Sequence, residues 1–403
     1  MLKANMVMFI HILFLFYLFL FYDKTLISLN LRYNEIGEQG AKYLANALLV
    51  NKALNILDLS HNQIMDQGVY YFSDALQYNT TLINLELGQN TISNAGIQYL
   101  ASALLKNTTL TTLNLEYNLL DNIGATYLAN ILKQNTTLTT LDLGHNNITE
   151  QGVQQLATAL ENNIILNTLI LQYTSTEEQG AKYLSDVMQK KTGLSVLDLG
   201  WSGTGNQGVL YLADALNNNN TILTTLILAD NEIDIQGTQY LANALYNNKT
   251  LTVLNLRINR INSEAAKYLA GGLRNNTTLT TLNLDYNEIK KEGTKYLADA
   301  LQDNKTLTTL ILSDNGIGDQ GAQHFAVALK HNKTLTTLAL DFNKIQTNGL
   351  YYLAEIVRNH PILTTLDLSG NRIGNTGAQY IADILQDNTV NSFFFNLKNI
   401  LSL

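Results

Sequence analysis

The sequence contains no cysteine, one proline and one tryptophan among 403 residues. Without cysteine there is no disulfide framework, no thiolate metal site and no cysteine nucleophile. The absence of disulfides favours a reducing compartment. A single proline excludes proline-rich linkers and suits an uninterrupted series of strands and helices.

Positive charge is also scarce. The formal net charge is −8, and no run of five or more basic residues occurs. Binding to nucleic acid requires Lys and Arg clusters that neutralise phosphates. We therefore expect a protein that does not bind nucleic acid.

Motifs that carry chemistry are missing as well. The chain holds no GxxxxGK[ST] phosphate loop, no HExxH and no GxSxG. Its carboxylates show no apolar pocket that would tune one of them for acid–base work. We therefore predict no catalytic residues, no metal site, no cofactor and no enzymatic activity.

The chain does contain a repeat. The pattern LxxLxLxxN occurs thirteen times, beginning at Leu26, at a spacing of twenty-eight residues with one extra residue near 217–220. A fixed period of this length is typical of a solenoid, in which similar units stack on their neighbours. We expect thirteen units over residues 24–388, a hydrophobic segment at 1–23 and a partial repeat at 389–403.

One unit, residues 279–304, illustrates the pattern. Leu282 and Leu284 predict a short strand whose leucines point inwards. Asn287 ends the strand, and its amide can hydrogen-bond the backbone of the turn as one rung of an internal ladder. Gly293 then opens an amphipathic helix.

The stacking distances of strands and helices differ. Strands lie about 4.8 Å apart, whereas packed helices need roughly 8–10 Å. A stack of strand–helix units must therefore bend. The predicted fold is an α/β solenoid, a right-handed α/β horseshoe with parallel strands on the concave face and helices on the convex face.

Units such as NTTLTTLNLEYNLLDNIGATYLANIL, residues 107–132, resemble ribonuclease-inhibitor-like leucine-rich repeats. They are most similar to the repeat region of NOD-like receptors, the NLRC3-like group in particular. The resemblance implies a protein-recognition module with an innate-immune or regulatory role. Ran GTPase-activating proteins share this architecture, so a GTPase-activating or signalling scaffold is the alternative. For that activity, Arg32 and Arg257 lack a matching local motif.

One column of outward positions on the predicted strands is rich in aromatic residues. Exposed aromatic side chains are typical anchors of binding sites, but rings one repeat apart can also stack for stability alone. The column consists of Tyr33, His61, Gln89, Tyr117, His145, Tyr173, Trp201, Asp230, Ile258, Tyr286, Asp314, Phe342 and Gly370.

A second column is acidic. A concave face with these charges would attract a basic protein partner by electrostatic steering, although the charges can also be ordinary solvated surface. Arg257 is expected to pair with Asp285. The column consists of Asp58, Glu86, Asp142, Asp198 and Asp367, with Glu116, Asp285 and Asp341 two residues further along their strands.

Two successive units depart from the pattern together. Thr174 and Ser202 replace the ladder asparagine, and Thr176 and Thr204 replace the following isoleucine. Such departures concentrate at functional or strained sites, although sequence drift is the alternative. We predict a binding centre here, with further concave-face contacts from other units. The predicted partner-binding residues are Tyr173, Asp198, Trp201 and Asp230, followed by Tyr117, Tyr286, Phe342, Asp285 and Asp341.

The segment Met6–Tyr22 is apolar except for one histidine, and its seventeen residues are at the short limit of a membrane span. No small-residue cleavage site follows it. The sequence predicts membrane association through an uncleaved anchor. The alternatives are a cytoplasmic protein and a wrongly assigned start. Ten Asn-X-Ser/Thr sequons also occur, and they would matter only in the secretory pathway.

Overall fold

The computed structural model describes residues 25–190, 192–217, 221–357, 360–387 and 394–396. The chain divides into two compact units, Met1–Ser202 and Gly203–Leu403. Both units are built from alternating three-residue strands and helices of three to four turns.

The described part of the first unit contains seven strands that pair in parallel, each with the next along the chain. The strands are β1 (Ser28–Asn30), β2 (Ile56–Asp58), β3 (Asn84–Glu86), β4 (Thr112–Asn114), β5 (Thr140–Asp142), β6 (Thr168–Ile170) and β7 (Val196–Asp198). The helices are α2 (Glu38–Val50), α3 (Met65–Leu76), α4 (Asn94–Leu104), α5 (Asn122–Leu132), α6 (Glu150–Leu160) and α7 (Glu177–Met188).

The second unit repeats this arrangement. Its described strands also pair in parallel in chain order. They are β8 (Thr225–Ile227), β9 (Val253–Asn255), β10 (Thr281–Asn283), β11 (Thr309–Ile311), β12 (Thr337–Ala339), β13 (Thr365–Asp367) and β14 (Phe394–Asn396). The helices are α8 (Gly205–Leu216), α9 (Ile235–Asn247), α10 (Ser263–Asn275), α11 (Lys290–Asp303), α12 (Gly318–Leu329), α13 (Thr347–Val357) and α14 (Gly374–Asp387).

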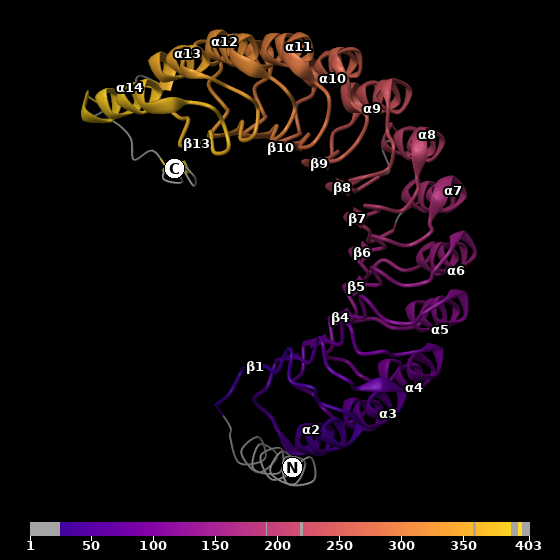
Figure 1. Cartoon of the computed structure of the whole chain (residues 1–403). Coiled ribbons are helices and arrows are strands. Elements are labelled where there is room, and N and C mark those ends of the chain that lie inside the picture. The colour runs from indigo at the N-terminus through magenta and orange to yellow at the C-terminus, as the bar shows by residue number, and fades with distance from the viewer. Residues whose placement is uncertain (1–24, 191, 218–220, 358–359, 388–393, 397–403) are drawn as a thin grey trace. The chain divides into compact units, whose positions relative to one another are not determined.

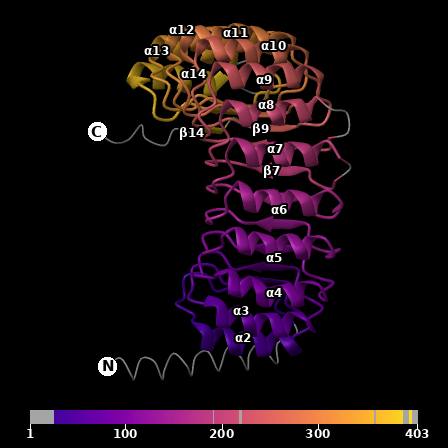
Figure 2. The same cartoon turned by 90° about the vertical axis from the view of Figure 1, so that its right-hand side faces the viewer.

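The strand register follows the sequence period. Leu29 lies opposite Leu57, twenty-eight residues later, and the other internal pairs keep this offset. The last pair differs, because Leu366 lies opposite Phe395, one residue more. Within each unit the strands line the inner side and the helices cover the outer side (Figure 1), and successive helices of the first unit stack side by side (Figure 2). The predicted α/β solenoid is confirmed.

The core lies between the strands and helices of each unit. Leu279, Leu282 and Leu284 of one repeat are fully buried, and so are their counterparts from Leu54 to Leu368, whereas those of the first repeat are half-buried. Because the repeated leucines remove their side chains from water at every turn of the solenoid, their burial is the main stabilising contribution of each unit.

The asparagine ladder is confirmed by its hydrogen bonds. The Asn118 Nδ2 donates to the carbonyl oxygens of Leu87 and Leu115, both at 3.0 Å. Its Oδ1 accepts from the backbone N–H groups of Asn90 and Ile92, at 3.1 and 2.9 Å. One buried amide therefore satisfies backbone groups of its own turn and of the preceding repeat, which fixes the distance between them.

A close approach explains the glycine at the start of α4. A Cβ atom on Gly96 would lie 2.6 Å from Ile92 Cγ2 and 2.7 Å from the Asp66 Oδ1. That Asp66 oxygen accepts hydrogen bonds from the backbone of Ser93 and Gly96, at 2.7 and 3.1 Å. A side chain from one repeat thus caps the helix of the next, and only glycine leaves room for it.

The localisation prediction requires correction. The predicted anchor, Met6–Tyr22, lies outside the described residues. No helix among the residues that the structure does describe combines the length and the hydrophobicity needed to cross a membrane. This finding overturns the prediction of a membrane-anchored protein.

Candidate functional site

The aromatic column does not lie on the strands, as its period suggested, but in the turn three residues after each strand ends. Its non-glycine members all have a positive φ, from 48° at Asp314 to 60° at Tyr33. This left-handed backbone costs a residue other than glycine about 1–2 kcal/mol, and among such residues Asn, Asp and His are enriched there. The tyrosines, Trp201 and Phe342 therefore occupy a position that the backbone alone would give to Gly, Asn, Asp or His.

In the first unit the column forms a continuous stack of four rings. The ring centroids of Tyr117 and His145 are 3.6 Å apart, those of His145 and Tyr173 are 3.8 Å apart, and those of Tyr173 and Trp201 are 4.8 Å apart. The planes are tilted by 12°, 22° and 9°. We call Tyr117, His145, Tyr173 and Trp201 the aromatic stack. The predicted ring-on-ring packing is thus present.

The aromatic stack also remains accessible. Tyr117 is 48% exposed and Tyr173 is 43% exposed, whereas His145 and Trp201 are half-buried. Because neighbouring rings cover each other's faces, a partner would meet mainly ring edges and the two tyrosine hydroxyls. Burial lowers the pKa of His145, so it disfavours the charged form of the histidine in the middle of the stack.

The acidic positions lie next to the aromatic stack, at the ends of the strands. Asp142 is the last residue of β5, and its Oδ1 accepts a hydrogen bond from the Gly144 N–H at 2.9 Å. Burial raises the pKa of Asp142 to about 7, against the lowering effect of that hydrogen bond. The charges of Glu116, Asp198 and Glu86 raise the pKa further.

Long side chains cover part of this acidic surface. A Cβ atom on Gly88 would lie 2.8 Å from the Glu116 Cγ, and one on Gly144 would lie 2.8 Å from the Gln172 Cγ. Each long side chain therefore lies back over the glycine of the preceding repeat. Gln172 thus lies beside the glycine whose N–H donates to Asp142, and the burial of this carboxyl group raises its pKa.

Asp198, at the end of β7, repeats the arrangement of Asp142. Its Oδ1 accepts from the Gly200 N–H at 2.8 Å. Burial raises the pKa of Asp198, and the hydrogen bond from Gly200 opposes this shift. The structure therefore brings together Tyr117, Tyr173, Trp201 and Asp198 of the predicted site in the first unit. Asp230 belongs to the second unit.

The second unit holds the remaining predicted residues in separate contacts. The Arg257 guanidinium lies 5.0 Å from the centre of the Tyr286 ring. Arg257 therefore contacts this ring and does not form the expected ion pair with Asp285. The Asp285 Oδ1 instead accepts from the Ser313 N–H at 2.7 Å. Because a flat guanidinium stacks well on a ring face, the ring competes with the carboxylate for it.

Asp341 and Phe342 follow the same principle of local pairing. The Ser313 Oγ donates to the Asp341 Oδ1 at 2.6 Å. The Phe342 ring lies against Gly370, where a Cβ atom would be 2.5 Å from the ring. Burial raises the pKa of Asp285. The hydrogen bonds from Ser313 and the charge of Arg257 lower this pKa and so reduce the shift.

The two irregular repeats depart from the pattern beneath the surface. The Thr174 Oγ1 donates to the Leu171 carbonyl at 2.6 Å and lies 2.9 Å from the Thr176 Oγ1. The Ser202 Oγ donates to the Leu199 carbonyl at 2.6 Å. These buried hydroxyl groups replace one bond of the asparagine ladder and support the turns that carry Tyr173 and Trp201.

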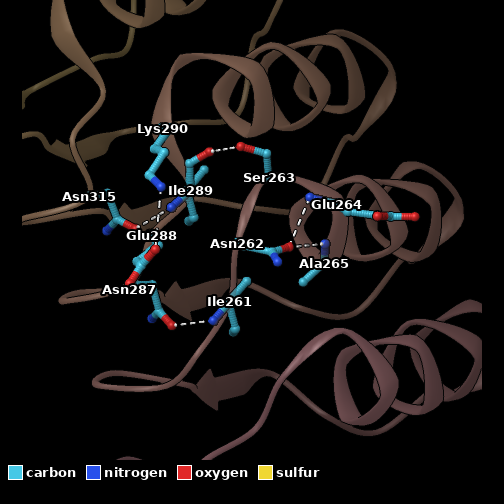
Figure 3. A network of polar contacts seen from close by, with 10 residues as sticks. All are labelled: Ile261, Asn262, Ser263, Glu264, Ala265, Asn287, Glu288, Ile289, Lys290 and Asn315. Carbon is cyan, nitrogen blue, oxygen red and sulfur yellow. Dashed lines mark hydrogen bonds and ion pairs between the residues drawn. The ribbon is translucent and has the colours of Figure 1, made fainter.

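Sequence reasoning did not anticipate the polar network at the start of α10 (Figure 3). The Asn262 Oδ1 accepts from the Glu264 and Ala265 N–H groups, both at 3.0 Å. The helix α4 is capped by Asp66 of the preceding repeat. The equivalent position before α10 is Ile235, which has no polar side chain, so α10 is capped by its own Asn262. At this helix start Ala265 stands in place of the usual glycine. The signal was visible in the sequence as that single exception.

Comparisons with known proteins agree with the fold. A solved internalin from Listeria monocytogenes is similar over 92% of this chain and 86% of its own, with 21% identity and a TM-score of 0.51. A chain from the crystal structure of the Rad7 and Elc1 complex in yeast is similar over 89% of this chain and 80% of its own, with 16% identity and a TM-score of 0.55. No curated protein matches the sequence.

The family model described as Leucine Rich repeat matches ten segments that cover more than half of the chain. They are residues 22–45, 50–73, 78–101, 106–129, 134–157, 247–270, 275–298, 303–326, 331–354 and 359–382. The unmatched stretch between them contains the irregular repeats of Thr174 and Ser202. Leucine-rich repeats form protein–protein interaction modules, and the ribonuclease-inhibitor-like and NOD-like subtypes stay predictions. The chain belongs to the leucine-rich repeat family.

Proposed function

We propose that this protein is a non-catalytic recognition module that binds a basic, extended segment of a protein partner on the strand face of its first unit. The observation that carries the proposal is the aromatic stack beside half-buried carboxylates. The aromatic stack would contact the partner's apolar side chains, and the carboxylates would contact its Lys or Arg side chains.

The backbone supports a functional role for the rings. Each aromatic residue in the left-handed region carries a conformational cost of about 1–2 kcal/mol, and stacking returns about 0.5–1.5 kcal/mol for each ring pair. Stability alone therefore gives little reason to hold four rings at these positions. Aromatic residues with accessible edges are, in contrast, the side chains that dominate the energy of protein interfaces.

The carboxylates support a basic partner. The negative charges of Glu86, Glu116 and Asp198 each raise the pKa of Asp142 and so disfavour its ionised form. A Lys or Arg side chain placed among them would relieve this repulsion and draw the proton from Asp142. Charge complementarity of this kind raises the association rate and selects the partner.

The single tryptophan makes the test direct. Because Trp201 is the only tryptophan and belongs to the aromatic stack, its fluorescence reports on this site alone. We would titrate the purified protein with extended peptides that alternate apolar residues with Lys or Arg, and with matched peptides that carry Glu. The basic peptides should change the fluorescence of Trp201, and the acidic ones should not.

A matched pair of variants separates this surface from the rest of the chain. Tyr173→Ala should weaken binding of the basic peptides, whereas Phe342→Ala in the second unit should leave it unchanged. Peptide binding that leaves the Trp201 fluorescence unchanged and is indifferent to Tyr173→Ala would refute the proposed site. Stimulation of GTP hydrolysis across a panel of small GTPases would instead support the alternative scaffold function.

A further inference from the structure

A second set of buried asparagines lies between each helix and the next strand, on the side of the repeat opposite to the first ladder. These side chains are at most 7% exposed. We call them the loop ladder. In the described residues it consists of Asn51, Asn79, Asn107, Asn135, Asn163, Asn248, Asn276, Asn304 and Asn332.

Asn107 shows what each rung does. Its Nδ2 donates to the carbonyl oxygen of Leu76, the last residue of α3, at 2.8 Å and to that of Asn79 at 3.1 Å. Its Oδ1 accepts from the backbone of Thr109 and Leu110, at 2.9 and 2.7 Å. One amide therefore caps the helix of the preceding repeat and positions the following strand.

The bond to the preceding helix recurs along both units. The Nδ2 of Asn135 lies 2.6 Å from the Leu104 carbonyl, and that of Asn332 lies 2.7 Å from the Leu301 carbonyl. The buried His360 keeps the same function, because its Nε2 lies 3.1 Å from the Leu329 carbonyl. The position therefore requires a side-chain N–H inside the protein.

Seven members of the loop ladder are also the asparagines of Asn-X-Thr sequons: Asn79, Asn107, Asn135, Asn248, Asn276, Asn304 and Asn332. N-glycosylation forms a bond between Nδ2 and C1 of a sugar, with loss of one amide proton and release of the lipid diphosphate that carried the sugar. The modified nitrogen is the atom that donates to the preceding helix. A glycan on this nitrogen is sterically incompatible with the stacked repeats, because the nitrogen is buried between them.

We propose that the loop ladder forms only when these seven sequons are unmodified, so that the repeat array folds in a compartment without N-glycosylation. The transferase acts on flexible chain, before a sequon is buried. A chain that enters a lumen with N-glycosylation would therefore receive glycans on asparagines that must be buried when the array folds. The inference rests on the burial of the asparagines and is independent of the proposed partner.

The chain offers a matched control variant. Replacing the sequon threonine by valine removes the sequon and keeps the asparagine. The threonine hydroxyls contribute little to the ladder, because the Thr81 and Thr109 Oγ1 atoms approach the asparagine side chain only at 3.4–3.5 Å. The control carries Thr81→Val, Thr109→Val, Thr137→Val, Thr250→Val, Thr278→Val, Thr306→Val and Thr334→Val.

The test compares the full chain, expressed in eukaryotic cells, with the same chain behind an added cleavable secretion signal. Mass spectrometry after glycosidase treatment locates the glycans, and limited proteolysis measures folding. The chain without the signal should be unglycosylated and protease-resistant. The secreted chain should carry glycans at ladder sites and be degraded at least tenfold faster. Glycans at the exposed Asn147 and Asn275 would serve as positive controls.

The threonine-to-valine control should restore protease resistance in the secretory pathway. So should an inhibitor of lipid-linked oligosaccharide synthesis applied to the unmodified sequence. Secreted chain that carries ladder glycans and resists proteolysis would overturn the inference, as would secreted chain that folds with its ladder sites unmodified. Degradation of both the valine control and the inhibitor-treated chain would trace the failure to another cause and would also overturn it.

Discussion

The strand faces of the two units have the same backbone but different surfaces. In the first unit, Tyr117, His145, Tyr173 and Trp201 stack without interruption. In the second unit no two aromatic residues follow each other at these positions, and Tyr286 pairs with an arginine instead. The positions hold Asp230, Ile258, Tyr286, Asp314, Phe342 and Gly370. A continuous aromatic surface therefore depends on ring identity in consecutive repeats and not on the repeat geometry, which is common to both units.

The interior differs in the opposite sense. The asparagine ladder of the second unit continues from Asn231 through Asn259 to Asn371. In the first unit it stops after Asn146, where Thr174 and Ser202 follow. The unit with the more elaborate surface thus has the less regular interior. We expect the second unit to depend more on its ladder and the first unit more on its surface for function.

The largest effect should come from breaking the ladder in the second unit. Asn287→Ala removes bonds to the Leu256 and Leu284 carbonyls, both at 3.0 Å. It also removes the bond to the Ile261 N–H at 3.0 Å, which Figure 3 shows. Leaving buried backbone groups unpaired should lower the free energy of unfolding by about 3 kcal/mol. Thr174→Ala in the first unit removes a smaller set and should cost about 1 kcal/mol. Urea unfolding measures both; equal losses would contradict the comparison.

The next largest effect concerns binding. Trp201→Ala removes one end of the aromatic stack and should weaken a basic peptide about tenfold to thirtyfold, or roughly 1.5–2 kcal/mol. Phe342→Ala should change the affinity less than twofold, because Phe342 belongs to the second unit, away from the aromatic stack. Isothermal calorimetry measures both variants, and circular dichroism should confirm unchanged folding. Similar losses in the two variants would remove the distinction between the surfaces.

A smaller effect depends on pH. Burial raises the pKa of Asp142 to about 7 from its ordinary value of 3.8, so the folded protein binds this proton more tightly than the unfolded chain does. Its favourable contribution is therefore present below pH 3.8 and is lost as the pH rises towards 7. Asp142→Asn should become more stable than the original chain between pH 4.5 and 8, by about 1 kcal/mol after allowance for solvent screening.

Asp285→Asn provides the comparison in the second unit. The pKa of Asp285 is also raised by burial, but its bonds to Ser313 and the charge of Arg257 oppose the shift. Its dependence on pH should therefore be weaker than that of Asp142→Asn in the same urea series. A stability difference for Asp142→Asn that stays constant over this range would show that the carboxyl group does not titrate there.

The smallest effect tests the backbone of the column. Ile258 is β-branched and has a φ of 53°, which is an unfavourable combination. Ile258→Asn should raise the free energy of unfolding by about 0.5 kcal/mol, because Asn tolerates this conformation. Tyr173→Asn should bring no gain, since it also loses two stacking contacts. Thermal melting distinguishes them, and a comparable gain in both would mean that stacking contributes nothing.

Much of the fold followed from the repeat. The period, the inward leucines, the ladder asparagines such as Asn118 and the parallel strands could be predicted because each unit repeats the same local constraints. The site was less accessible to prediction. The aromatic column was assigned to strands, whereas its residues lie in the turns that follow them. The reason is that the alternation of side chains in the sequence continues beyond the residue where the strand ends.

The sequence by itself determined that this protein is a stack of leucine-rich repeats, because a fixed spacing of buried and small residues admits few other folds. Only the tertiary structure decided which positions remain open to a partner. It places Tyr117 and Trp201 in one aromatic stack, raises the pKa of Asp142 and buries the sequon asparagines. The physical reason is that each of these properties arises from contacts between neighbouring repeats, twenty-eight residues apart in the chain and a few ångströms apart in space.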